Sequence, residues 1–309
     1  MNYTLRQLNI FTEVSKQQSI TKAADALFLS QPAVSIQLKK FQDQFDLPLI
    51  EVIGKKIYVT DFGERIVEAA TEILRLAEEV ENLNLAHTGQ LIGKIYITSV
   101  STGKYVVPFF LTDFFAEHSG VELNLDVTNK EAVVESVVSN EVDFALVSIP
   151  PDRVQHESLS LVKNKLYLVA AANLDVPKKP THSIFDDHPL IYREEGSGTR
   201  QTMEKFLSKY NIPIKKKLEL TSNEAVKQAI LAGLGMSIMP LIGLKNELNL
   251  GQLKIVPIKG LPIETQWMLI WPKGKKHSPA ALALLKYVQE HRADIMTNYF
   301  DWYEDYLGK

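Results

Sequence analysis

The chain has 309 residues, of which 45% are hydrophobic and 23% are charged, so it is long enough for two or three globular domains. It has no cysteine, which excludes disulfides and thiolate chemistry, and no apolar run approaches the roughly 18 residues of a membrane span. With no signal-peptide core at its N-terminus, we expect a cytoplasmic protein without a membrane partner. The net charge of −3 divides into +2 over residues 1–60, −5 over 61–88 and 0 over 89–309, so only the first segment is positive.

The first predicted elements are a helix beginning near Leu5 and two short helices with a tight corner between them, over residues 19–41. Ser19 and Ser30 are good helix N-caps, and Pro32 suits a first helical turn. The small pair Ala23-Ala24 would let two helices cross closely. This pattern predicts a helix-turn-helix.

The last of these helices has two unlike faces. The apolar face, at helical spacing, consists of Val34, Leu38 and Phe41. The polar face consists of Gln31, Ser35 and Lys39. Amides, hydroxyls and ammonium groups reach base edges and phosphates, so this face favours DNA binding. The alternative is an ordinary helical hairpin with a solvated face.

Residues 50–60 predict a small hairpin with a basic tip at Gly54-Lys55-Lys56, which either meets phosphates as a wing or is a solvated turn. A long helix follows over 61–87, with apolar residues repeating at intervals of four and three. This coiled-coil seam consists of Phe62, Ile66, Ala69, Ile73, Leu76, Val80 and Leu83. With nothing in its own chain to pack against, it predicts a dimer; the alternative is packing on the next domain. Residues 88–90 would end the helix and form a hinge.

From residue 91 onward, predicted strands alternate with helices, which indicates a parallel sheet with crossover helices. Two α/β series joined by crossings near 162–165 and 264–267 predict a hinged two-lobe binding domain. An aromatic-rich segment from Asp294 to Lys309 is expected to form an extra helix, packed on the same chain or on a dimer mate.

Three polar clusters follow strands or open helices at the edge of the sheets where ligands bind. Hydroxyls, free N–H groups and an arginine suit an anion, so we expect a carboxylate or phosphate metabolite here, and no metal or other cofactor. For each Ser or Thr alone, helix capping is the alternative. The candidate effector residues are Ser99, Ser101, Thr102, Thr128, Asn129, Val147, Ser197, Gly198, Thr199 and Arg200.

An enzyme is disfavoured. Gly196-Ser197-Gly198 lacks the nucleophile-elbow spacing, no phosphate-binding loop motif occurs, and the seven histidines lack metal-ligand spacing. A purely DNA-structural protein would leave the two-lobe domain unexplained.

Residues 5–60 resemble the winged helix-turn-helix of the LysR-type transcriptional regulators. The matching residues include Leu8, Phe11, Val14 and the run Ser30-Gln31-Pro32-Ala33-Val34-Ser35. Ile50 and Val52 depart from the family's Phe and Arg, which leaves Lys55 and Lys56 to supply a wing contact. The resemblance implies double-stranded promoter DNA as partner. The implied DNA-binding residues are Ser19, Thr21, Gln31, Pro32, Ser35, Gln37, Lys39, Lys40, Lys55 and Lys56.

The second half resembles the periplasmic-binding-protein-like effector domain of the same family, through Gly196-Ser197-Gly198-Thr199-Arg200 and residues 233–240. This implies an antiparallel homodimer through the linker helix, a homotetramer, and an influence on RNA polymerase recruitment. The branch it resembles most includes regulators of carbon-fixation and sulfur-assimilation operons.

The expected fold is therefore multidomain, with an all-α-type winged helix-turn-helix, a long linker helix and an α/β two-lobe domain. The expected bounds are 1–60 for DNA binding, 61–90 for the linker and hinge, 91–300 for the effector domain and 301–309 for a tail. Within the effector domain, lobe I would comprise 91–163 and 267–300, and lobe II 164–266.

Overall fold

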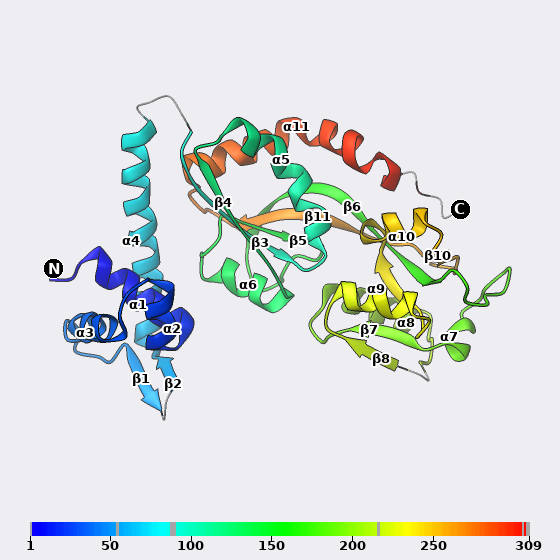
Figure 1. Cartoon of the computed structure of the whole chain (residues 1–309), viewed down its shortest axis with the longest axis horizontal. Coiled ribbons are helices and arrows are strands. Elements are labelled where there is room, and N and C mark those ends of the chain that lie inside the picture. The colour runs from blue at the N-terminus through cyan, green and yellow to red at the C-terminus, as the bar shows by residue number, and fades with distance from the viewer. Residues whose placement is uncertain (1, 54–55, 87–90, 215–216, 305, 307–309) are drawn as a thin grey trace. The chain divides into compact units, whose positions relative to one another are not determined.

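A computed structural model describes residues 2–53, 56–86, 91–214, 217–304 and 306, without the side chains of 78, 79, 81–86 and 304. Contacts divide the chain between Ile92 and Gly93 into two units, which are described separately (Figure 1). The predicted hinge at 88–90 and part of the predicted tail, residues 305 and 307–309, lie outside the described residues.

The first unit is a helical bundle with a hairpin. Its elements are α1 (Leu5–Gln17), α2 (Ile20–Ala26), α3 (Gln31–Gln42), β1 (Ile50–Ile53), β2 (Lys56–Val59) and α4 (Asp61–Ala86). Thr4 and Gln7 form a capping box at the start of α1. The Ser19 hydroxyl accepts from the Lys22 N–H at 3.4 Å, as predicted, whereas Ser30 occupies the N-cap of α3 without a side-chain bond.

The first half of α4 packs on its own unit. Phe62 and Ile66 lie against a core that α1, α2 and α3 share, and Ala70 is 1% exposed within it. The expectation that this helix has nothing in its own chain to contact is therefore wrong for this half. Beyond it, Ile73 and Leu76 are exposed.

The second unit is built on one large sheet with the strand order β10-β6-β11-β5-β3-β4, and β9 also pairs with β6. Its strands are β3 (Gly93–Val100), β4 (Val121–Thr128), β5 (Phe144–Val147), β6 (His156–Ala171), β9 (Ser237–Pro240), β10 (Leu253–Val256) and β11 (Ile263–Pro272). β3 pairs in parallel with β4 and β5, as the alternating pattern predicts. The long antiparallel pair β6–β11 runs through both halves of the unit.

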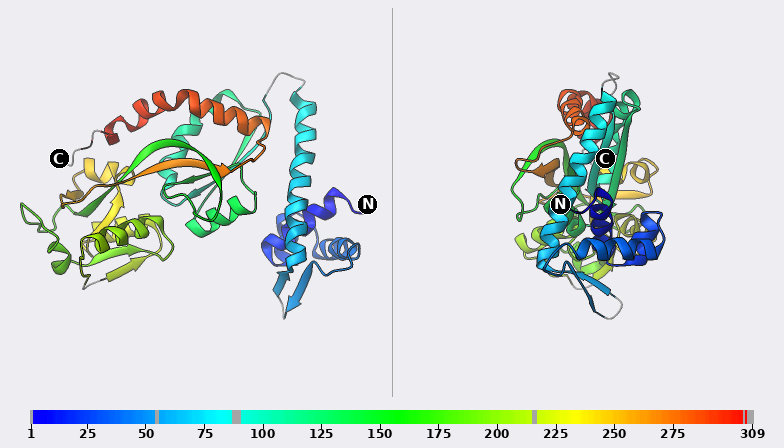
Figure 2. Two further views of the ribbon diagram at one scale, coloured as in Figure 1. Left: turned by 180° about the vertical axis from the view of Figure 1, so that it is seen from behind. Right: turned by 90° about the vertical axis from the view of Figure 1, so that its left-hand side faces the viewer.

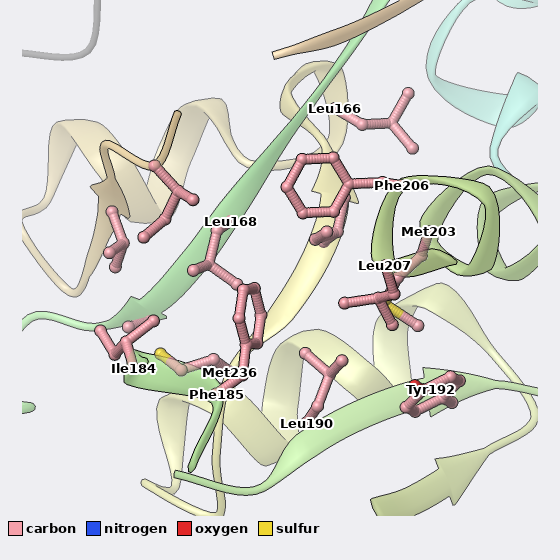
Figure 3. Close-up of a cluster of buried hydrophobic side chains, with 14 residues drawn as sticks. Leu166, Leu168, Ile184, Phe185, Leu190, Tyr192, Met203, Phe206, Leu207 and Met236 are labelled. Atoms are coloured by element: carbon pink, nitrogen blue, oxygen red, sulfur yellow. The ribbon is translucent and has the colours of Figure 1, made fainter. Parts of the chain in front are cut away.

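Helices α5 (Val107–Glu117) and α6 (Lys130–Val138) lie on opposite faces of β3 and β5 (Figure 1). In the other half, β7 (Leu190–Arg193) pairs in parallel with β8 (Lys217–Leu220). The remaining helices there are α7 (Ile184–Asp187), α8 (Gly198–Lys209), α9 (Asn223–Leu231) and α10 (Lys245–Asn249). Side chains of β6, α7, β7 and α8 form one core, shown in Figure 3, with Phe185 and Phe206 at its centre. This core fixes the end of β7 relative to the start of α8.

The last helix, α11 (Pro279–Glu304), is longer than the predicted 279–292 and contacts α5, β3 and β6 (Figure 2). The expected separate tail helix is its continuation. Tyr303 is fully buried, and its hydroxyl accepts from the Lys165 N–H at 2.5 Å. Lys245 of α10 lies 5.0 Å from the Trp302 ring centroid. The aromatic end of α11 thus joins the β6–β11 crossing to the second half of the unit.

Among the described residues, no helix combines the length and apolar character that crossing a membrane requires.

Candidate DNA-binding face and effector cavity

The predicted DNA-binding face lies on α3, opposite the buried Val34, Leu38 and Phe41. Most of its predicted residues are exposed, and Gln37 is half-buried. The exposed ones are Gln31, Pro32, Ser35, Lys39 and Lys40. The helix therefore presents amide, hydroxyl and ammonium groups from a rigid base, which is the arrangement that groove binding needs.

The flanking predicted residues are less uniform. Thr21 and Lys56 are exposed, whereas Ser19 is half-buried by its capping role, and Lys55 lies outside the described residues. Sequence reasoning missed Phe28, which is 96% exposed in the turn after α2 with a left-handed φ of 55°. An exposed aromatic side chain cannot be inferred from spacing, because its apolar character predicts burial.

In the second unit, a cavity opens between its two halves, with an empty volume of about 390 Å³ that includes space open to solvent. It is lined by the last residues of β3 and β4, by the residues that follow β3, β4 and β5, by the end of β7 and by the start of α8. The lining residues are Val100, Ser101, Thr102, Thr128, Asn129, Lys130, Ser148, Ile149, Arg193, Glu194, Ser197, Gly198 and Thr199. Carboxyl ends of strands and helix N-termini meet here, where ligands of α/β domains commonly bind.

Most of the predicted effector residues line this cavity. Ser101, Thr102, Thr128, Asn129, Ser197, Gly198 and Thr199 do so. The capping alternative holds for Asn129, whose Oδ1 accepts from the Ala132 N–H at 2.9 Å. Thr102 and Ser197 make no side-chain capping bond, which leaves their hydroxyls available to a ligand.

The structure does not bring Ser99, Val147 or Arg200 to the lining. Ser99 is fully buried and donates to the Val100 carbonyl at 3.1 Å, while Val147 packs in an apolar cluster. Arg200 donates to Glu204 at 2.8 Å and to Glu219 at 2.9 Å. The hydrogen bond with Glu204 above all raises the pKa of Arg200, so this guanidinium is a charged, carboxylate-bound group outside the cavity.

The cation that sequence reasoning missed is Arg193. Only 4% of its side chain is exposed, and its Nη2 donates across the cavity to the Ser101 hydroxyl at 3.0 Å. Lys130, which the sequence places in the polar cluster at the end of the second strand of this unit, also lines the cavity, and its Nζ donates to Gln201 of α8 at 2.9 Å. Burial lowers the pKa of Lys130, so an anion beside it would favour the charged form. Both cations join the two halves of the unit across the cavity.

The turn after β3 is tightly packed. A Cβ at Gly103 would lie 2.1 Å from the Ser99 Oγ and 2.8 Å from Leu146, so only glycine fits beside Thr102. Within the described part of the chain, no group of three or more His, Asp or Glu side chains is arranged to hold a metal ion.

Comparison with known proteins assigns a family to each of the two units. Residues 5–64 match the family "Bacterial regulatory helix-turn-helix protein, lysR family", and residues 88–293 match "LysR substrate binding domain". The chain belongs to the LysR family. It is a LysR-type transcriptional regulator, a class of DNA-binding proteins that are not enzymes, and the predicted fold class is confirmed.

The relatives of this LysR regulator include regulators of carbon fixation, which confirms the predicted branch. A RuBisCO operon transcriptional regulator of Allochromatium vinosum is 36% identical over 295 residues, covering 95% of this chain and 98% of that protein. The HTH-type transcriptional activator CmpR of Synechocystis is 33% identical, covering 94% of this chain and 96% of that protein.

Solved structures resemble both the whole chain and its second unit. The Synechocystis CcmR regulatory domain, in complex with 2-phosphoglycolate, is 30% identical with a TM-score of 0.61, covering 64% of this chain and 96% of that chain. Full-length CbnR with its target DNA covers 93% of this chain and 99% of that chain with a TM-score of 0.65, and at 19% identity it shows the fold alone.

Proposed function

We propose that this LysR regulator controls promoters of inorganic-carbon assimilation, and that a small phosphorylated carboxylate in the cavity of its second unit sets its affinity for promoter DNA. The cavity carries the proposal, because it brings Arg193, Lys130 and several hydroxyls together between the two halves of the unit. Its chemistry suits phosphate and carboxylate oxygens. The carbon-fixation relatives and the CcmR complex with 2-phosphoglycolate support the choice of ligand.

On the DNA side, the proposed contacts to bases come from Gln31, Ser35 and Lys39, with Gln37, Lys40 and Lys56 toward the phosphates. Exposure of most of these side chains on one unit supports this assignment. We further propose that the protein acts in the cytoplasm as a homodimer joined through α4, that dimers pair into tetramers, and that ligand binding alters contact with RNA polymerase.

The test is a fluorescence anisotropy titration of promoter DNA, with and without 2-phosphoglycolate. Wild type should change its DNA affinity when 2-phosphoglycolate is added. Arg193→Met should keep DNA binding and lose the response, because a hydrophobic side chain cannot pair with an anion. Arg153→Met is the matched control: Arg153 is an exposed arginine of the same unit that does not line the cavity, so the response should remain.

Gln31→Ala combined with Ser35→Ala should weaken promoter binding at least about thirtyfold, because each of the two base contacts contributes about 1–3 kcal/mol. The same double variant should still bind 2-phosphoglycolate. Unchanged promoter affinity would remove these residues from the DNA face. A response retained in Arg193→Met would remove the cavity from the proposal.

A further inference from the structure

The end of β7 carries a charged pair that the proposed function does not explain. Arg193 donates through Nε and Nη2 to both carboxylate oxygens of Glu194, each at 2.7 Å. Two parallel bonds of this kind form the fork-shaped contact that guanidinium groups also make with phosphates and ligand carboxylates. Within the described part of the chain, the carboxylate that pairs with Arg193 is therefore that of its own neighbour in sequence.

The two partners differ in exposure. Arg193 is 4% exposed on its side chain, whereas Glu194 is 23% exposed, and both line the cavity. A buried guanidinium needs a counter-charge, because an unpaired buried charge is strongly unfavourable. Glu194, in contrast, could rotate toward water at low cost. The pair can thus open from the glutamate side without leaving Glu194 buried.

An anionic ligand that reached Arg193 would meet the Glu194 carboxylate already in place. Glu194 occupies the Nε–Nη2 edge of the guanidinium, so an anion bound at that edge must displace it. Like charges at this distance repel strongly in a site of low dielectric. Arg193 also donates to Ser101 across the cavity at 3.0 Å, so a ligand in this position would touch both halves of the unit.

We propose, on the basis of the function proposed above, that the Glu194 carboxylate occupies the anion-binding position at the Arg193 guanidinium until the effector displaces it. Glu194 is therefore an internal competitor of the effector. The exchange keeps Arg193 paired in both states and transfers its counter-charge from the chain to the ligand. It also sets specificity. A ligand must outcompete an intramolecular carboxylate, so a doubly charged phosphate displaces Glu194 and a simple monocarboxylate does not.

Because Glu194 competes, the anion-binding position at Arg193 is unoccupied in only a fraction of the molecules. The apparent affinity for the effector is reduced by that fraction. Glu194→Gln removes the negative charge and keeps the side-chain shape. It should tighten binding of 2-phosphoglycolate about tenfold, and binding of inorganic phosphate likewise. Glu195→Gln is the matched control, because Glu195 is the exposed next residue, does not line the cavity and changes the net charge equally.

The measurement is isothermal titration calorimetry of the full chain with each probe, for wild type, Glu194→Gln, Glu195→Gln and Arg193→Met. Tightening in Glu194→Gln alone, with loss in Arg193→Met, is the expected result. If Glu194→Gln weakens binding or leaves it unchanged while wild type binds, Glu194 serves to position Arg193. The proposal that Glu194 competes with the effector is then wrong. If neither wild type nor Glu194→Gln binds either probe, the competitor and the proposed ligand class are both wrong.

Discussion

Two helices of this chain, α4 and α11, have the same length of 26 residues and reach opposite outcomes. Along the second half of α4 the apolar repeat is exposed, from Ile73 at 38% and Leu76 at 46% to Val80 at 67%. Along α11 the repeat is buried to the end, with Phe300 at 1% and Tyr303 at 0%. The sequences alone do not separate these cases, because both carry apolar residues at helical spacing.

The difference lies in the packing partners that each helix finds in its own unit. α11 crosses α5 and reaches β6, so its last turns find aromatic and backbone partners, including Phe109, Phe110 and Lys165. α4 leaves the core of the first unit after Leu74, and of the later apolar side chains that the structure describes, Leu76 and Val80 are exposed. A stripe of this kind is typical of a surface that a second chain covers. The comparison therefore predicts that another protein molecule covers the exposed apolar residues of α4, whereas the apolar residues of α11 are covered by its own chain.

The strongest test of this contrast places charge in the α4 stripe. Ile73→Asp with Leu76→Asp would bury unpaired carboxylates in a dimer seam, at a cost of about 3–5 kcal/mol or more. The dimer dissociation constant should rise at least about a hundredfold. Analytical ultracentrifugation measures it, with Glu68→Lys, a charge change at an exposed polar position of α4, as control. A double variant as dimeric as wild type would show that α4 is not the seam.

On α11, the corresponding test is the removal of Tyr303. Tyr303→Ala deletes a fully buried ring and the acceptor of the Lys165 N–H, so unfolding of the full chain should become easier by about 3–5 kcal/mol. Tyr303→Phe keeps the ring and should cost about 1–3 kcal/mol. Tyr299→Ala, one turn earlier and 36% exposed, is the control and should cost less than either. Urea denaturation followed by circular dichroism measures all three, and equal effects at 299 and 303 would contradict the anchoring role.

The segment just before α11 gives a smaller, pH-dependent effect. His277 stacks on Phe144 at 4.8 Å between centroids, and burial above all lowers its pKa from 6.5 to about 4. Below pH 6.5 the unfolded chain takes up a proton here that the folded chain does not, so stability falls as the pH drops from 6.5 toward 4. His277→Phe should remove about 2 kcal/mol of the loss between pH 7 and pH 5.

The control for this titration is His291→Phe, at an exposed histidine of α11. Urea midpoints at both pH values give the comparison. A pH dependence that is identical in wild type and His277→Phe would show that His277 does not titrate in this range on unfolding.

Much of the fold follows from the sequence because local signals agree with the tertiary structure. The strand at 217–220 and the helix at 223–231 match their predicted positions almost residue for residue, since turn residues mark their ends. The length of β6 does not follow, because most of residues 156–165 are polar, and this part of the strand is paired with β11. The end of α11 was missed for a similar reason: its partners lie more than a hundred residues away.

The cavity likewise depends partly on local sequence signals and partly on long-range contacts. Hydroxyls next to strand ends are visible as short motifs, and most of those predicted do line it. Choosing between Arg193 and Arg200 required the fold, because Arg193 ends a buried strand and points inward, whereas Arg200 lies in the first turn of α8 beside Glu204. From the sequence alone, an arginine in the first turn of a helix suggests an anion-binding residue. In the structure, Arg200 instead forms an ion pair within its own helix.

The most direct measurement of the central claim is hydrogen–deuterium exchange of the full chain with and without 2-phosphoglycolate. A ligand held in the cavity by Ser101, Thr102, Arg193 and the start of α8 should slow amide exchange in residues 99–103 and 193–201. Exchange in the β1–β2 hairpin of the first unit should be unchanged when DNA is absent. Unaltered exchange in both cavity segments at saturating ligand, or protection confined to other parts of the chain, would contradict the account.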